Sequence, residues 1–154
     1  MIKVFYNSII AKVLLYFSQC DLIMLFGMVF SKAKKEDVSQ GVINHENVHI
    51  RQWNEMTMLS GIIILALVLV FGISAWWMLL SGVTYYVWYA IEFMCKSVYY
   101  SIMNDEWDCP SKRLNPYKEL SFEREARLAD KDDNYLANSK YFAWLGMIQE
   151  SHDV

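Results

Sequence analysis

The chain has 154 residues, of which 55% are hydrophobic and 16% aromatic, and its formal net charge is −3. This length suits one domain with a core of its own, and the acidic balance leaves no basic surface for nucleic acid. The three cysteines are an odd number without C-x-x-C spacing, so they indicate neither a disulfide framework nor a cysteine zinc site.

The N-terminal segment, residues 1–35, is apolar for most of its length. Ile2–Phe17 carries only Lys3 and Lys12 as charged residues and lacks the small-residue cleavage site of a signal peptide. We therefore expect an amphipathic helix that lies in the membrane interface.

The next stretch, Leu22–Lys32, is apolar and bounded by charged residues, which fits a strand or a short β-hairpin. A further membrane crossing from Ile9 to Phe30 stays open as an alternative, although Asp21 would then lie in the membrane. The hydrophobic pattern does not decide between them.

The sequence INHENVHIRQWNE, in a helix predicted over residues 39–56, contains the pattern H-E-x-x-H as His45, Glu46 and His49. Residues four apart share one face of a helix, so both imidazoles can bind one ion. Glu46 lies beside such an ion, where a general base would act on a metal-bound water. We interpret the motif as a metal site rather than a polar cluster on a helix surface.

No charged side chain occurs in the 36 residues from Met56 to Ile91. One helix of that length would measure ~54 Å, far more than the ~30 Å hydrocarbon core of a bilayer. Ser81-Gly82 interrupts the run, so we predict a transmembrane helical hairpin over residues 57–103, made of Thr57–Leu80 and Val83–Met103. A buried hairpin in a soluble protein is the alternative, but IIILALVLVFGI is apolar on every face of a helix.

Glu92 and Lys96 stand four residues apart in the returning helix. Ionisable groups at membrane depth usually face protein or pair with each other, so we expect these two side chains to pair. A proton or ion path remains the alternative.

Basic residues flank the hairpin on both sides, at Lys32, Lys34, Lys35 and Arg51 before it and at Lys96, Lys112, Arg113 and Lys118 after it. Because cytoplasmic flanks carry an excess of Lys and Arg, both ends of the hairpin are predicted to be cytoplasmic. The H-E-x-x-H motif would then also lie on the cytoplasmic side.

After the hairpin the chain becomes polar. Residues 104–115 are predicted to form a loop, and Asn115-Pro116 is typical of a helix N-cap followed by proline at the first helical position. Residues 116–150 would then form a polar helix containing SFEREARLADKDD and an amphipathic helix near Lys140–Ile148. That last helix would place apolar side chains on one side, namely Tyr141, Trp144, Leu145 and Ile148.

A catalytic zinc site needs a third protein ligand. His152 lies in the last four residues of the chain, so a carboxylate is the better candidate, and Glu119, Glu123 and Glu125 compete for the role. An even number of crossings returns them to the side of the histidines. On a helix Glu123 and Glu125 point about 200° apart, so only one of them can face the metal, and geometry alone leaves the choice open.

H-E-x-x-H followed by a helical glutamate resembles the gluzincin group of zinc metallopeptidases, which includes membrane-embedded HtpX-like and CAAX-processing peptidases and BlaR/MecR-type sensors. Their third ligand stands in patterns of the form E-x-x-A-D or E-x-x-[SC]-D. The sequence EREAR, residues 123–127, matches E-x-x-A but has Arg127 in the aspartate position. The resemblance favours Glu123, and it implies Zn²⁺ bound by His45, His49 and Glu123.

The missing aspartate matters because it usually supports one of the histidines, and such partners tune metal affinity. Asp130 or a backbone carbonyl is the candidate replacement. Tyr117, Tyr135 and Arg124 are candidates for stabilising an oxyanion, although packing and solvated charge are the commoner roles of such residues.

The motifs INHENVHIRQWNE, YVWYAIEF, SFEREA and YLANSKYFAW also resemble a group of small bacterial membrane proteins of unassigned function, in pieces between Asn44 and Trp144. This resemblance implies one membrane-embedded domain over residues 1–154. The predicted fold is mainly α, a membrane hairpin inserted in a minimal gluzincin-like metal-binding core, with a short β element at the N-terminus. The expected location is the bacterial inner membrane.

The sequence thus predicts an integral-membrane zinc metallopeptidase with Glu46 as its catalytic residue, acting on a peptide or membrane protein at the cytoplasmic face. One alternative is a non-catalytic, zinc-stabilised sensor or partner module. Another is a membrane di-iron carboxylate enzyme, since Glu46-x-x-His49 is half of its signature. A second E-x-x-H is missing, because Gln149 stands three residues before His152.

Overall fold

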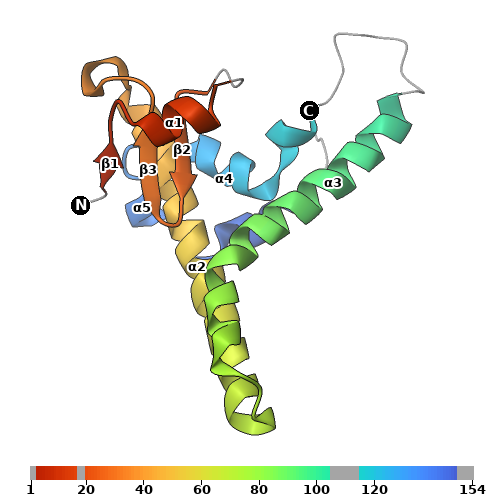
Figure 1. Cartoon of the computed structure of the whole chain (residues 1–154). Coiled ribbons are helices and arrows are strands. Elements are labelled where there is room, and N and C mark those ends of the chain that lie inside the picture. The colour runs from red at the N-terminus through yellow and green to blue at the C-terminus, as the bar shows by residue number, and fades with distance from the viewer. Residues whose placement is uncertain (1–2, 17–19, 105–114, 149–154) are drawn as a thin grey trace. The chain divides into compact units, whose positions relative to one another are not determined.

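The computed structural model describes residues 3–16, 20–104 and 115–148 (Figure 1). The fold is mainly helical with one small sheet near the N-terminus, as the sequence predicts. The chain divides into two compact units, Met1–Glu55 with Ala126–Tyr141, and Met56–Glu125 with Phe142–Val154. Helices α2 (Gln40–Phe71) and α4 (Ser121–Ala129) contribute residues to both units.

The small sheet belongs to the first unit. Its strands are β1 (Val4–Phe5), β2 (Leu22–Leu25) and β3 (Met28–Ser31), in the order β1-β3-β2, with β1 parallel and β2 antiparallel to β3. The predicted β-hairpin is therefore present, and it excludes the alternative helical crossing over Ile9–Phe30.

The turn of this hairpin, Phe26-Gly27, has positive φ angles of 48° and 75°, as a tight two-residue turn requires. A Cβ on Gly27 would lie 3.0 Å from the ring of Trp53 in α2. The glycine therefore serves both the turn and the close approach of the hairpin to the helix.

Helix α1 (Ile9–Leu14) packs on the sheet through a cluster of Ala11, Leu15 and Phe30. It is shorter than the helix predicted over Ile2–Phe17, because β1 takes up part of that segment. Its other apolar side chains are exposed, namely Ile9, Ile10, Val13 and Leu14.

The end of α4 packs on the first turns of α2 within the first unit. Val48 of α2 forms a buried cluster with Ala126 and Ala129 of α4, against which Tyr135 of α5 (Tyr135–Asn138) also packs. Arg51 lies 5.7 Å above the ring of Tyr135. Further hydrogen bonds join Arg51 Nη1 to Ser139 Oγ at 2.7 Å and Asn44 Nδ2 to Asp133 Oδ1 at 2.6 Å.

Helix α2 is continuous from the H-E-x-x-H motif into the apolar run, where two separate helices were predicted. It ends at Gly72, whose φ of 65° is the left-handed conformation that commonly terminates helices. The chain then continues into the 3-10 helix η2 (Ala75–Val83) and α3 (Thr84–Asn104). The reversal therefore lies near Gly72–Ser74, and the predicted turn at Ser81-Gly82 is incorporated in η2.

Helix α2 is long and apolar enough to cross a membrane. Of its most apolar stretch of 18 residues, only 6% is buried. Among the described residues it is the one helix that meets this criterion. The second crossing, and with it the full transmembrane hairpin, stays a prediction.

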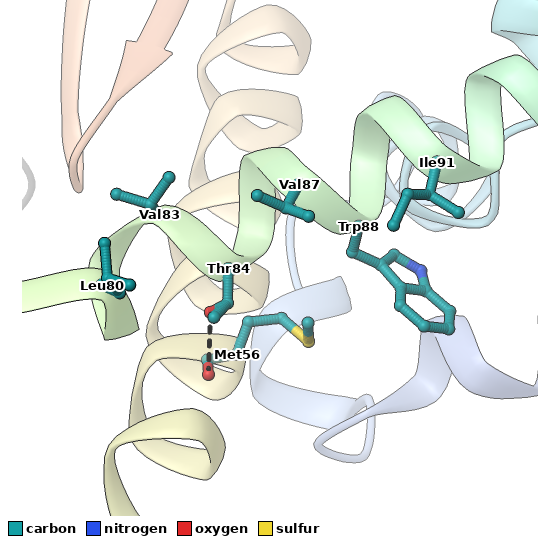
Figure 2. Close-up of a pocket in the computed structure, with 7 residues that line it drawn as sticks. All are labelled: Met56, Leu80, Val83, Thr84, Val87, Trp88 and Ile91. Carbon is teal, nitrogen blue, oxygen red and sulfur yellow. Dashed lines mark hydrogen bonds between the residues drawn. The ribbon is translucent and has the colours of Figure 1, made fainter. Parts of the chain in front are cut away.

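Within the second unit, α2 and α3 are joined by small polar side chains. Ser60 Oγ lies 3.0 Å from Thr84 Oγ1, and each hydroxyl also lies within hydrogen-bonding distance of a backbone carbonyl of the other segment, Ser60 of Ser81 and Thr84 of Met56. Beside this contact lies a cavity of about 320 Å³ whose lining is apolar apart from Thr84 (Figure 2). Its other lining residues are Met56, Leu80, Val83, Val87, Trp88 and Ile91.

The predicted cap at Asn115 is confirmed, since its side chain accepts a hydrogen bond from the Tyr117 N–H at the start of the 3-10 helix η4 (Pro116–Glu119). Most of the predicted loop, residues 105–114, lies outside the described residues. The predicted pair of Glu92 and Lys96 is present, with 2.9 Å between Oε1 and Nζ.

The amphipathic helix predicted near Lys140–Ile148 is wrong. This segment contains only the 3-10 helix η5 (Ala143–Met147), because Phe142 adopts a left-handed conformation with φ 58°. Trp144 is buried against Phe122 and Trp88, while Tyr141 and Leu145 are exposed.

Candidate metal centre

Two imidazoles lie together on helix α2. His45 is half-buried and His49 is buried, and their Nε2 atoms are 3.1 Å apart. The rings meet nearly edge to face, with an interplanar angle of 77°. The spacing of four residues thus brings both ring nitrogens to one point, as the sequence predicts.

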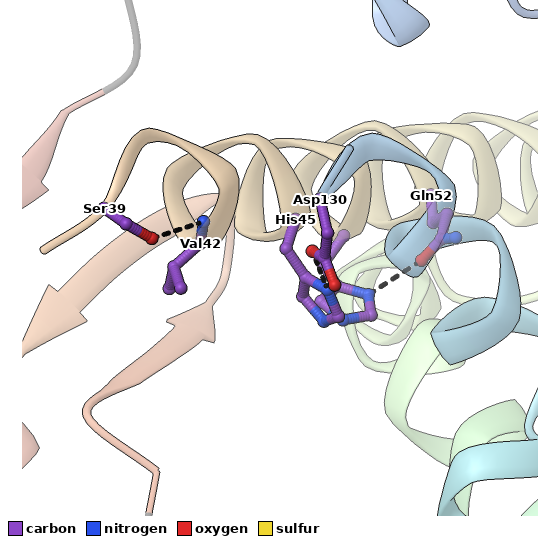
Figure 3. A network of polar contacts seen from close by, with 6 residues as sticks. Ser39, Val42, His45, Gln52 and Asp130 are labelled. Carbon is purple, nitrogen blue, oxygen red and sulfur yellow. Dashed lines mark hydrogen bonds and ion pairs between the residues drawn. The ribbon is translucent and has the colours of Figure 1, made fainter. Parts of the chain in front are cut away.

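Each of these rings is held through its other nitrogen. His45 Nδ1 lies 3.0 Å from Asp130 Oδ1, and His49 Nδ1 lies 2.9 Å from Gln52 Oε1 (Figure 3). Both partners are acceptors, so we assign the proton of each neutral imidazole to Nδ1, which leaves a lone pair on each Nε2.

Two lone pairs that face each other at 3.1 Å repel, unless a proton or a cation lies between them. In a tetrahedral zinc site with Zn–N bonds of ~2.0–2.1 Å, the two nitrogens would be about 3.3 Å apart. The histidine pair is therefore close to the spacing that a shared divalent ion requires.

The chain positions these partners in two ways. Gln52 is fully buried one turn after His49, so helix periodicity brings it to Nδ1. Asp130 follows the end of α4, and its carbonyl comes so close to Gly41 that a Cβ there would lie 2.7 Å from it. Asp130 is a candidate support that the sequence predicts, whereas Gln52 was not predicted, although its spacing of three residues from His49 is a usable signal.

Glu123 is the third member of the candidate site. Among the described residues, His45, His49 and Glu123 form a group that could hold a metal ion. Glu123 is 2% exposed. One turn further along the same helix, Ala126 packs against Val48, next to His49 in sequence. The alanine of the E-x-x-A pattern thus lies in a helix contact.

Two other glutamates were competitors for this position. Glu125 is 1% exposed and is not a member of the group that could hold an ion. Glu119 lies in η4, and its carbonyl accepts a hydrogen bond from Lys96. Glu46, the predicted general base, follows His45 directly in α2 and is half-buried.

The candidates for oxyanion stabilisation each contact another residue of the chain. Tyr117 lies beside Tyr89, with 6.5 Å between ring centroids, and Tyr135 packs under Arg51. Arg124 donates to the carbonyl of Met147 at 3.2 Å. His152 lies outside the described residues.

No family model matches this sequence, and no curated protein or solved structure matches it either. The likeness to gluzincins therefore rests on the motif residues alone. Two imidazoles and one carboxylate are a donor set that suits divalent transition metals, zinc among them.

Proposed function

We propose that this protein is an integral-membrane zinc metallopeptidase whose zinc is bound by His45, His49 and Glu123. The observation that carries the proposal is the histidine pair, because both Nδ1 atoms are held by acceptors while both Nε2 atoms face one point. Glu123 completes the donor set of a catalytic zinc site, which leaves the fourth position to water.

When zinc is bound in such a site, it lowers the pKa of a coordinated water and polarises the carbonyl group of the substrate. Glu46 would accept the proton that the water loses as its oxygen attacks the carbonyl carbon of the peptide. The same carboxylic acid would then protonate the departing amine as the C–N bond breaks. Asp130 and Gln52 would hold the two imidazoles in the tautomer that binds metal.

The apolar part of α2 supports a membrane location for this chemistry. Because the motif precedes the apolar run in the same helix, the site would lie near one membrane surface, and the basic flanks favour the cytoplasmic one. The substrate would be a peptide or a segment of a membrane protein.

A second candidate is a non-catalytic, zinc-stabilised membrane module. Burial of His49 and Glu123, which are 6% and 2% exposed, favours it, because buried ligands are typical of closed structural sites. The two functions share the metal and differ in whether Glu46 acts on water.

Metal analysis of the detergent-purified protein tests the part that both functions share. We expect one zinc ion per wild-type chain and its loss in His49→Ala. Glu123→Gln should lower zinc content, whereas Glu125→Gln, a change of the same size in the same buried helix, should retain it. Loss of zinc in the Glu125 variant alone would show that the wrong carboxylate was chosen.

Glu46→Gln tests the catalytic part. The amide is isosteric but accepts no proton, so zinc content and thermal stability should stay at wild-type values, while cleavage of a library of quenched fluorescent peptides falls by about 10²–10⁴-fold. An unimpaired variant would refute the role of Glu46. A wild-type protein that binds zinc but cleaves no peptide or membrane-protein substrate would favour the structural function.

A further inference from the structure

Helix α3 contacts the start of α4 through two polar side chains on one face, Tyr89 and Glu92. The Tyr89 hydroxyl donates to Glu123 Oε1 at 2.9 Å. The two oxygens of Glu92 accept from Ser121, one from the backbone N–H and one from the hydroxyl, both at 2.7 Å. Residues three apart share a helix face, so one face of α3 contacts both Ser121 and Glu123.

The carboxylate of Glu92 is well placed to hold α4. The Ser121 N–H belongs to the first turn, where backbone donors have no partner within the helix and where the helix dipole favours negative charge. Glu92 is 8% exposed and is paired with Lys96, which also donates to the Glu119 carbonyl. The charge of this buried carboxylate is therefore compensated, and Lys96 adds a second connection from α3.

The residue between these two contacts is fixed by aromatic packing. Phe122 is fully buried, stacked on Tyr85 at 4.8 Å between ring centroids and edge to face with Trp144 at 4.6 Å. Three successive residues of α4, Ser121 to Glu123, thus have partners that restrict their rotation. A glutamate side chain has three rotatable bonds, and Tyr89 restrains the carboxylate at its end.

We propose that Tyr89 and Glu92 are positioning residues of the metal centre, in which Tyr89 fixes the carboxylate of Glu123 and Glu92 fixes the helical turn that carries it. This inference rests on the metal centre of the proposed function and does not depend on peptide hydrolysis. Outer partners of metal ligands typically change metal affinity by about 10–100-fold. A hydrogen bond that only satisfied a buried carboxylate would change stability instead.

The experiment compares Tyr89→Phe with Tyr99→Phe, a loss of the same hydroxyl from an exposed ring of the same helix. Zinc affinity of the full-length protein in detergent is measured by competition with a chelator, and the thermal midpoint of the metal-free protein is recorded beside it. We expect Tyr89→Phe to raise the zinc Kd by about 10–100-fold and to shift the visible absorption of the cobalt-substituted protein. Tyr99→Phe should match wild type in both.

A zinc Kd and a cobalt spectrum of Tyr89→Phe equal to those of Tyr99→Phe would overturn the role of Tyr89, whatever happens to the thermal midpoint. Glu92→Gln should also weaken zinc binding, because its amide N–H₂ group offers a donor to Ser121, whose N–H and O–H are themselves donors. Unchanged zinc affinity in Glu92→Gln would overturn the role of Glu92.

Absence of zinc from the wild-type protein would refute the metal centre and this inference together. That outcome differs from a wild type that binds zinc and a Tyr89 or Glu92 variant that binds it equally well, which would refute the positioning role alone.

Discussion

Asp130 and Gln52 decide what the two histidines can do. An imidazole that donates from Nδ1 to a fixed acceptor has one orientation and one tautomer, so little freedom remains to be lost when Nε2 binds a metal. The aspartate that the gluzincin pattern places directly after the third ligand is replaced here by Arg127. Asp130, three residues further on, supplies a carboxylate to His45.

Asp130→Ala should therefore raise the zinc Kd by about 10–100-fold, because His45 loses the acceptor that orients it. Asp130→Asn keeps an acceptor oxygen and should cost less. Asp37→Ala removes the same charge from an exposed side chain of the 3-10 helix η1 (Lys35–Asp37) and serves as the control. Competition with a chelator measures all three, and equal affinities for Asp130→Ala and Asp37→Ala would contradict the assignment.

At the scale of the elements, α2 combines two roles in one uninterrupted helix. Its first turns carry the histidine pair and pack against the end of α4, and its later turns are apolar and exposed. The close contact at Gly41 allows the chain after α4 to bring Asp130 to His45. The position of Asp130, a partner of the candidate metal centre, thus depends on a glycine in a helix.

Two glycines of α2 give a matched test of that contact. In Gly41→Ala the new methyl group would lie 2.7 Å from the Asp130 carbonyl oxygen, so the backbone has to shift, at a cost of roughly 1–3 kcal/mol. In Gly61→Ala the nearest atom, Ser81 Cβ, is 3.9 Å away, and alanine should stabilise the helix by up to about 1 kcal/mol.

Thermal unfolding in detergent should accordingly show a lowered midpoint for Gly41→Ala and an equal or raised midpoint for Gly61→Ala. Gly41→Ala should also bind zinc more weakly, because Asp130 moves with the backbone. Equal midpoints for the two variants would indicate that the approach at Gly41 is not required.

At the scale of the whole molecule, the reversal near Gly72–Ser74 changes the expected membrane geometry. The apolar part of α2 from Met56 to Phe71 would extend ~24 Å, less than the ~30 Å of a hydrocarbon core. A crossing then requires local thinning of the bilayer, which costs only fractions of a kcal/mol per Å. Because this apolar part is shorter than the hydrocarbon core, the alternative is a hairpin that enters the membrane and leaves it on the same side.

Cysteine labelling distinguishes these arrangements. In a background with Cys20, Cys95 and Cys109 replaced by serine, Ser74→Cys and Asn115→Cys should react with an impermeant reagent from opposite sides of the membrane, Asn115→Cys from the cytoplasmic side. Labelling of both from one side would refute the crossing. It would leave the histidine pair unaffected, because His45, His49, Asp130 and Gln52 belong to the other compact unit.

The sequence alone determined the features that depend on local spacing. His45 and His49 share a face because they are four residues apart in a helix, and the same rule pairs Glu92 with Lys96. The mainly helical fold also follows from local pattern. The short N-terminal sheet follows only in part, because the apolar stretch Leu22–Lys32 left a β-hairpin and a membrane crossing both open. The Asn115 cap is equally local, since its partner is two residues away.

The tertiary structure alone decided which distant groups meet. Asp130 reaches His45 across 85 positions and Tyr89 reaches Glu123 across 34, and no periodic pattern encodes such separations. The reversal at Gly72 could not be predicted either, because Gly72 and Ser81-Gly82 are equivalent signals in sequence, and backbone conformation selects one of them. Helix spacing fixes which side chains of one element point together, whereas the partner on another element is set by how closely the two elements pack.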